Sequence, residues 1–191
     1  MGTTGQRRDK EAIAQQVAIV VGEGLRGCVD AAVALARKRL PMLVVGETGT
    51  GKELVVDAYG RAWPTESIGK INCTGTTDAL LESELFGHVR GAFTGAVEDT
   101  AGIVESYDVV CLDELGDASA RFQAAILRFV EYRQYIKVGY PKVLRWEGRG
   151  IVASTNKVSG VRDDLRYRFR EVVIPPLRER VADIAKIIAH F

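Results

Sequence analysis

The chain has 191 residues, of which 47% are hydrophobic and 27% charged, as expected for a globular protein of one domain or of one domain plus a fragment. Its 26 basic and 25 acidic residues almost cancel, so composition gives no global electrostatic argument for binding nucleic acid or an anionic membrane. No apolar run approaches the roughly 20 residues of a membrane span, and the N-terminus lacks the hydrophobic core of a signal peptide. We therefore predict a cytoplasmic protein with no membrane partner, whose three cysteines are free or buried thiols because their spacing fits no zinc motif.

Short apolar runs alternate with helical periodicities along the chain. After a polar segment over residues 1–16, apolar residues recur at helical spacing over 25–36. PMLVV, residues 41–45, is a short apolar run before a glycine, which is typical of a buried strand. Further strands are expected at 67–72, 107–112, 150–154 and 171–174, and further helices from the glycine loop to about Trp63, at 77–87 with Thr77 as the cap, around 122–130, and from residue 180 onward. This alternation predicts an α/β fold, with a parallel sheet covered by helices on both faces.

GETGTGK, residues 46–52, follows the first predicted strand and opens a helix, which is the context that a P-loop requires. Glycines let backbone N–H groups surround phosphates, the helix N-terminus adds partial positive charge, and Lys52 supplies a full one. A plain glycine-rich turn is the competing interpretation. The candidate phosphate-binding residues are Gly46, Glu47, Thr48, Gly49, Thr50, Gly51, Lys52 and Glu53. Because Glu53 stands where serine or threonine usually helps to hold magnesium, the metal must depend on another carboxylate.

CLDELGD, residues 111–117, supplies that carboxylate at the end of a predicted strand. Asp113 would hold Mg²⁺, directly or through water, and Glu114 would orient and deprotonate the attacking water. Asn156 ends the next strand, where it could sense the nucleotide or position water at the carboxyl edge of the sheet. Solvated acids at a strand end and a turn asparagine are the ordinary alternatives. Together with the P-loop, these residues predict a magnesium-dependent NTPase.

Several motifs then follow one another in a fixed order: GETGTGKE, ELFGH, GAFTGA, CLDELGD, STN, VRDDLRYR and PPLRER. Together they closely resemble the AAA+ domain of bacterial enhancer-binding proteins, the sigma-54-dependent transcription activators, from about residue 22 to 191. Glu53 after the P-loop lysine also matches this family. The resemblance implies an AAA+ P-loop core over 22–177, preceded by a polar or helical extension over 1–21 and followed by the start of a helical lid over 178–191, most of which we expect to be missing.

The resemblance gives GAFTGA, residues 91–96, a role as a loop that rises from a ring and touches sigma-54 in the RNA polymerase holoenzyme. The candidate contact residues are Gly91, Ala92, Phe93, Thr94, Gly95 and Ala96. The two glycines permit positive φ and a tight hinged turn, and the alanines keep the loop slim. Composition alone favours a core position for Phe93, whereas the resemblance implies that Phe93 is exposed in at least one nucleotide state.

Three further roles carry over by position. Asn72 matches the asparagine that restrains the catalytic glutamate, with a strand-end cap as the alternative. Arg162 and Arg168 match paired arginine fingers offered to the nucleotide of the neighbouring subunit, with a solvated charged face as the alternative. Such fingers require a homo-oligomer, which in the family is a ring, usually of six.

The resemblance therefore implies an ATP-hydrolysing activator that remodels the sigma-54 holoenzyme through the GAFTGA loop so that promoter DNA can open. We expect promoter DNA to be only an indirect partner, because no helix-turn-helix segment is recognisable. The connection from Asn156 to Arg162 is only KVSGV, shorter than is usual in the family, which bears on the finger geometry. The alternatives are a ring-forming or sigma-54-binding subunit without productive ATP turnover, and an AAA+ remodeller of some other protein.

Overall fold

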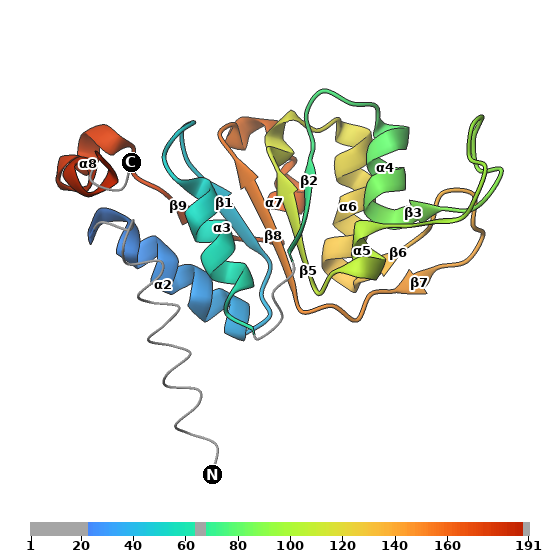
Figure 1. Ribbon diagram of the computed structural model, residues 1–191, viewed down its shortest axis with the longest axis horizontal. Coiled ribbons are helices and arrows are strands. Elements are labelled where there is room, and N and C mark those ends of the chain that lie inside the picture. Colours follow the sequence, from blue (N-terminus) through green and yellow to red (C-terminus); the bar gives the residue numbers. More distant parts are fainter. Residues whose placement is uncertain (1–22, 64–67, 189–191) are drawn as a thin grey trace, which may run out of the picture.

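The computed structural model describes residues 23–63 and 68–188, and a five-stranded parallel sheet lies at its centre (Figure 1). The extension expected over 1–21 lies outside the described residues. The strands stand in the order β2-β5-β8-β1-β9. Their bounds are β1 Met42–Val45, β2 Ile68–Asn72, β5 Val109–Asp113, β8 Gly150–Thr155 and β9 Arg170–Val173. The predicted α/β class is confirmed, and each of the five expected strands is present within two residues of its predicted ends.

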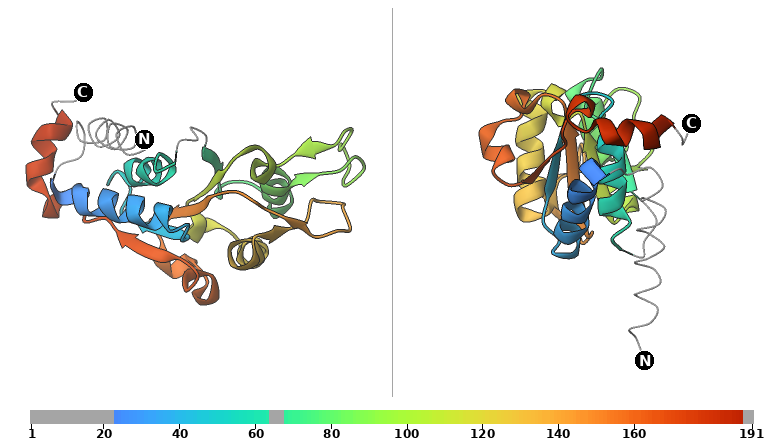
Figure 2. Two further views of the ribbon diagram at one scale, coloured as in Figure 1. Left: turned by 90° about the horizontal axis from the view of Figure 1, so that it is seen from below. Right: turned by 90° about the vertical axis from the view of Figure 1, so that its left-hand side faces the viewer.

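Helices cover both faces of this sheet because alternate strand residues point to opposite sides. Met42 and Val44 pack in one apolar cluster with α2 (Glu23–Arg37) and α3 (Lys52–Gly60). Leu43, between them, packs in the opposite cluster with α4 (Asp78–Phe86), α6 (Ala120–Tyr132) and α7 (Asp163–Arg166). Figure 2 shows the two helical layers on either side of the strands. The prediction of helices on both faces is therefore confirmed.

One helix end differs from the sequence-based expectation, and one predicted cap lacks its side-chain hydrogen bond. Helix α3 ends at Gly60 rather than near Trp63. After the hydrogen bond from Arg61 N to Asp57 O at 2.9 Å, the chain forms only i→i+3 bonds, from Ala62 N to Tyr59 O at 3.3 Å and from Trp63 N to Gly60 O at 3.5 Å. Thr77 does occupy the N-cap position of α4, but its side chain makes no cap hydrogen bond.

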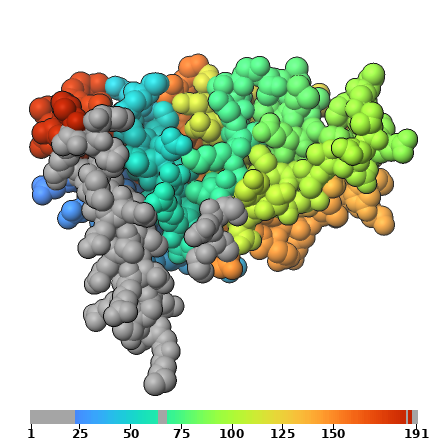
Figure 3. Space-filling view, in the orientation of Figure 1, coloured from blue at the N-terminus to red at the C-terminus, as the bar shows by residue number. Residues whose placement is uncertain are grey.

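Two hairpins extend from one end of the sheet and were not expected from the sequence. One pairs β3 (Gly87–His88) with β4 (Thr100–Ala101), and the other pairs β6 (Gln134–Tyr135) with β7 (Leu144–Arg145). The two are joined by a hydrogen bond from Val89 N to Val138 O at 3.1 Å. Figures 1 and 2 show them at the end of the molecule opposite to α8 (Val181–Ile188), and in Figure 3 the yellow-green segment between β3 and β4 projects from the surface.

Short turns complete the chain and carry several residues of the site described below. The helix α5 (Ile103–Ser106) precedes β5, and the 3₁₀ turns are η1 (Leu115–Asp117), η2 (Val158–Gly160) and η3 (Leu177–Glu179). In residues 23–63 and 68–188, no helix combines the length and apolar character needed to cross a membrane.

Candidate functional site

The glycine loop between β1 and α3 adopts a conformation that suits an anion. Gly49 and Gly51 have φ of 79° and 88°, which side-chain-bearing residues rarely adopt. The buried Thr50 hydroxyl donates to Glu47 O at 2.7 Å and holds the loop closed on itself. The N-terminus of the nine-residue helix α3 follows directly, so its unpaired N–H groups and partial positive charge face the loop.

The lysine of this loop lies against the glutamate that follows β5. Lys52 Nζ donates to Gly46 O at 3.2 Å and lies 3.4 Å from Glu114 Oε1. The other oxygen of Glu114 accepts a hydrogen bond from Asn156 N at 3.1 Å, and Asn156 Nδ2 donates to Thr48 Oγ1 at 3.2 Å. The structure thus brings together five of the predicted site residues from three segments of the chain. The order β5-β8-β1 makes this possible, since the three strands end side by side.

Glu114 holds its position with an unusual backbone. Its φ of 51° and ψ of 46° lie in the left-handed region, which costs a non-glycine residue of order 1 kcal/mol. The residue stands between the last residue of β5 and the turn η1, where this conformation directs its carboxylate toward Lys52. Strained residues of this kind are often found at functional sites.

Asp113, the other predicted acid, is held by a residue that sequence reasoning did not assign. The buried Ser154 hydroxyl on β8 donates a short hydrogen bond to Asp113 Oδ1. Within the described residues, no group of three or more histidine, cysteine or acidic side chains is placed to hold a metal. A magnesium ion at this edge would therefore depend on Asp113, phosphate oxygens and water, which is a donor set that suits it.

Two predicted residues make contacts away from this cluster. Asn72 lies beside Asp113 in the sheet register, but its Oδ1 accepts from Thr74 N at 2.9 Å and from Thr74 Oγ1 at 2.8 Å, which matches a strand-end cap. Glu53 forms an ion pair with Lys70 at 2.8 Å, and this hydrogen bond lowers the pKa of the Glu53 carboxyl. In this arrangement Asn72 does not restrain Glu114, and the Glu53 carboxylate is held by β2.

The two predicted arginine fingers lie on either side of α7, with Arg162 as its N-cap and Arg168 in the turn that follows it. Arg162 forms a two-point ion pair with Asp164, at 2.6 Å and 3.1 Å, and Arg168 Nη2 lies 2.7 Å from Glu131 Oε1 on α6. Among the contacts of the described residues, neither guanidinium reaches the P-loop of its own chain. Both side chains are partly exposed, so another chain could meet them.

Arginines of the PPLRER segment also contact the P-loop, although the sequence analysis gave them no role. Arg178 forms two hydrogen bonds of 2.9 Å to the Glu47 carboxylate, and these lower the pKa of Glu47. Arg180 is buried, donates to Thr50 O, and lies 3.4 Å from Asp183 on α8. The i,i+3 spacing of Arg180 and Asp183 is visible in the sequence, but their burial depends on packing between α8 and α2.

GAFTGA forms the central part of the connection between β3 and β4 at the far end of the molecule. Gly91 and Gly95 have φ of 80° and 100°, and a hydrogen bond of 2.9 Å from Gly91 N to Ala96 O closes the loop. Phe93 is 39% exposed, and its ring centroid lies 4.9 Å from that of His88. The core position that composition favoured for Phe93 is therefore wrong, whereas Ala96 is buried rather than exposed.

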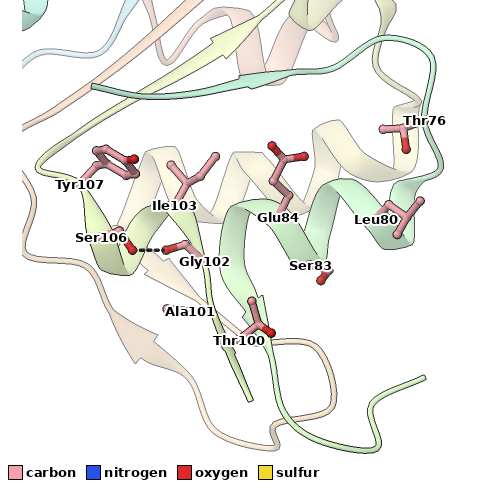
Figure 4. Close-up of a pocket in the computed structure, with 10 residues that line it drawn as sticks. All are labelled: Thr76, Leu80, Ser83, Glu84, Thr100, Ala101, Gly102, Ile103, Ser106 and Tyr107. Atoms are coloured by element: carbon pink, nitrogen blue, oxygen red, sulfur yellow. Dashed lines mark hydrogen bonds between the residues drawn. The ribbon is translucent and has the colours of Figure 1, made fainter. Parts of the chain in front are cut away.

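A surface pocket among the described residues lies elsewhere, between α4 and the segment from β4 to α5 (Figure 4). Its volume is about 500 Å³, and Leu80, Glu84 and Tyr107 are among its lining residues. None of the predicted site residues lines it. The pocket is open, so it gives no reason to move the candidate site from the P-loop.

Comparisons with known proteins identify the family of the chain. The family model described as the sigma-54 interaction domain matches residues 19–175. The chain is 43% identical over 180 residues to the hydrogenase transcriptional regulatory protein HoxA of Cupriavidus necator, covering 88% of this chain and 37% of that protein. It is 42% identical over 180 residues to the Nif-specific regulatory protein of Klebsiella pneumoniae, covering 87% of this chain and 34% of that protein.

A solved structure supports the fold. The crystal structure of NtrX from Brucella abortus in complex with ADP aligns with a TM-score of 0.75 at 24% identity, covering 95% of this chain and 43% of that one. The fold is that of the AAA+ ATPases. The chain spans little more than a third of the length of the curated relatives that it matches. The family match over most of the chain carries the conclusion: this chain belongs to the sigma-54 interaction domain family.

Proposed function

We propose that this chain is an ATP-hydrolysing transcription activator module that remodels the sigma-54 RNA polymerase holoenzyme through its GAFTGA loop. The observation that carries the proposal is that Lys52, Glu114 and Asn156 contact one another at one edge of the sheet. The same chain carries the GAFTGA loop at the projecting end of the molecule. ATP is the substrate and Mg²⁺ the cofactor. A cytoplasmic location follows from the proposed partner, and promoter DNA is affected only through the polymerase.

Nucleotide binding would exchange one partner of Lys52 for another. In the free site, Glu114 and Gly46 O satisfy the Lys52 ammonium. Phosphate oxygens in the loop would compete for the same ammonium, and Glu114 would then be free to accept a proton from an attacking water. Magnesium held by Asp113 would neutralise charge on the phosphates. The structures of NtrX solved with ADP and with ATP support nucleotide binding on this fold.

Hydrolysis would require a second copy of the chain. Arg162 and Arg168 do not reach the P-loop of their own chain, and each is held by a carboxylate on the outer surface. In a ring, usually of six subunits, these guanidinium groups would leave Asp164 and Glu131 for the phosphates of the neighbour. Arginine fingers of this kind raise hydrolysis rates by roughly 10³–10⁵-fold. The GAFTGA loop would respond to loss of the terminal phosphate, and Phe93 would contact sigma-54.

A second candidate is a ring-forming or sigma-54-binding subunit without productive turnover. The observation that favours it is the five-residue connection from Asn156 to Arg162, together with the two-point pairing of Arg162 with Asp164. The contact between Lys52 and Glu114 opposes it, because a site without turnover has no need of this arrangement.

ATPase activity against protein concentration separates these two candidates. A shared-site enzyme gains specific activity as the ring assembles, whereas a binding subunit shows none at any concentration. Glu114→Gln should keep nucleotide binding and lose hydrolysis, because the amide cannot accept the proton. If specific activity rises with protein concentration but is the same in the Glu114→Gln variant, Glu114 is not the catalytic base.

Capture of sigma-54 tests the role of the loop. Purified sigma-54 is offered to the chain with ADP and aluminium fluoride, which imitates the transition state. Phe93→Ala should abolish capture and spare hydrolysis, whereas Tyr107→Ala, a control of similar exposure at 38% against 39%, should spare both. Equal capture by the two variants would exclude Phe93 as the contact residue.

A further inference from the structure

Gln123 on α6 is a buried polar residue for which the proposed mechanism has so far no use. Its side chain is 1% exposed in an otherwise apolar stretch of helix. Burying an amide without partners would cost a few kcal/mol, so its contacts decide what it does. Those contacts lie on two separate segments of the chain.

The amide nitrogen of Gln123 binds the turn that follows Glu114. Nε2 donates to Ala118 O at 3.0 Å, with a longer contact of 3.5 Å to Leu115 O. Both carbonyls belong to η1 or to its C-cap, and Glu114 is the N-cap of the same turn. One end of the Gln123 amide is therefore fixed to the segment that carries the proposed catalytic base.

The same amide also binds the segment that leads to the proposed finger. Nε2 donates to Gly160 O at 2.8 Å, and Oε1 accepts from the backbone N of Arg162, also at 2.8 Å. Thus one side chain fixes the backbone at which the Arg162 side chain begins. Arg162 precedes the short helix α7, so a shift of its backbone moves the guanidinium as well.

The two segments that Gln123 joins are packed backbone against backbone. A Cβ added at Gly116 would lie 2.2 Å from Lys157 O, and one added at Gly160 would lie 2.0 Å from Gly116 O. Thr155 Oγ1 accepts from Gly116 N at 3.3 Å and from Lys157 N at 2.9 Å, which ties both turns to the end of β8. Contact this close leaves little room for one turn to move without the other.

We propose that Gln123 is a positioning residue that sets the Arg162 finger according to the state of the Glu114 turn in the same subunit. This inference rests on the proposed shared-site ATPase. Glu114 and Asn156 contact each other at the P-loop, and Gln123 carries their position to the finger that the subunit presents to its neighbour. The short connection of KVSGV is then suited to this coupling, since five residues packed on η1 transmit a displacement with little slack.

Mixing of subunits tests the proposal. Gln123→Met removes every hydrogen bond and keeps similar volume, and Gln134→Met on β6 is the matched control. Lys52→Ala cannot hold nucleotide but keeps its finger, whereas Arg162→Ala keeps its nucleotide site but has no finger. Gln123→Met should lose roughly 10²-fold in ATPase rate through a misplaced finger. It should bind a fluorescent ADP analogue within about twofold of the unmodified chain, as the control does.

The pattern of rescue decides the assignment. Mixing with Lys52→Ala subunits should restore activity, because their intact finger can act on the intact nucleotide site of a Gln123→Met subunit. Mixing with Arg162→Ala subunits should not, because neither variant then supplies a well-placed finger. Rescue by Arg162→Ala alone would place the defect at the Glu114 turn and overturn the proposal. Rescue by neither partner would indicate general damage and would overturn it too, as would full activity of Gln123→Met.

A reference pair separates this proposal from the proposed function. Lys52→Ala mixed with Arg162→Ala should regain activity if sites are shared. If that mixture stays inactive, the shared site and the role of Gln123 are both overturned. If that mixture is active but Lys52→Ala does not restore activity to Gln123→Met, only the role of Gln123 is overturned. If Gln123→Met does not fold by circular dichroism, Gln123→Glu is used under the same criteria, since it keeps an acceptor for Arg162 N but no amide donor.

Discussion

Removing one charge of the buried pair between Arg180 and Asp183 should destabilise the protein more than removing one charge of an exposed ion pair. The two side chains are 5% and 3% exposed, and their charged atoms are 3.4 Å apart. At an effective dielectric constant of about 20, Coulomb attraction at this separation is about 5 kcal/mol. Asp183→Asn keeps the shape and removes the negative charge, which leaves Arg180 buried with only neutral partners.

The expected loss is about 3 kcal/mol, at the lower end of the range of about 3–5 kcal/mol for breaking a buried pair. The lower end applies because Arg180 keeps its hydrogen bonds to Thr50 O and to Pro175 O, the latter at 3.0 Å. For a chain of this size, that loss lowers the melting temperature by about 6–12 °C. Asp183 also accepts a long hydrogen bond of 3.4 Å from Gly24 N, so the start of α2 should loosen as well.

Urea unfolding followed by circular dichroism measures the change, and the slope of the transition shows whether the unfolded state is altered. Glu147→Gln is the matched control, because its pair with Arg145 is 82% and 78% exposed and should contribute about 0.5 kcal/mol or less. Adding Arg180→Met to Asp183→Asn should recover part of the loss by removing the unpaired charge. The reasoning is refuted if Asp183→Asn costs no more than Glu147→Gln.

Three further outcomes are expected. Gly160→Ala should cost about 1–3 kcal/mol in urea unfolding, because its new Cβ would lie 2.0 Å from Gly116 O. Ser119→Ala should cost about 1 kcal/mol, since Ser119 Oγ accepts from Phe122 N at 3.0 Å as the N-cap of α6; an unchanged urea midpoint would contradict this. Burial raises the pKa of the Cys73 thiol from 9.0 to about 12, so the folded state favours the neutral thiol. That stabilisation is complete below pH 9.0 and is lost as the pH rises toward 12, by roughly 1 kcal/mol per pH unit; Cys73→Ala should lessen this slope in urea titrations.

Most strands of the sheet could be predicted because they are short apolar runs followed by glycine, proline or a polar residue. The P-loop was also predictable, since its glycines and Lys52 leave few other conformations. The β6–β7 hairpin was missed because its paired segments are two residues long and show no sustained alternation. Its place depends on a tertiary contact, the hydrogen bond from Val89 N to Val138 O.

At the site, the sequence predicted which residues meet better than it predicted which atoms touch. Parallel strands place Asn72 beside Asp113, but the orientation of the Asn72 amide is decided locally by Thr74. Gln123 was missed because a single glutamine within an amphipathic helix resembles a solvated position. Two of its partners lie 37 and 39 residues away, at Gly160 and Arg162, and sequence spacing gives no sign of them.

At Glu114, the left-handed backbone lowers the stability of the folded protein, whereas the carboxylate is needed for the proposed activity. Glycine adopts these angles without penalty and asparagine at little cost, so either would relieve the backbone strain, but either would also remove the carboxylate that pairs with Lys52. Neither can take a proton from water as a carboxylate does. The strained backbone at residue 114 is therefore compatible only with a protein that uses the carboxylate, and replacements that relieve the strain should give an inactive ATPase.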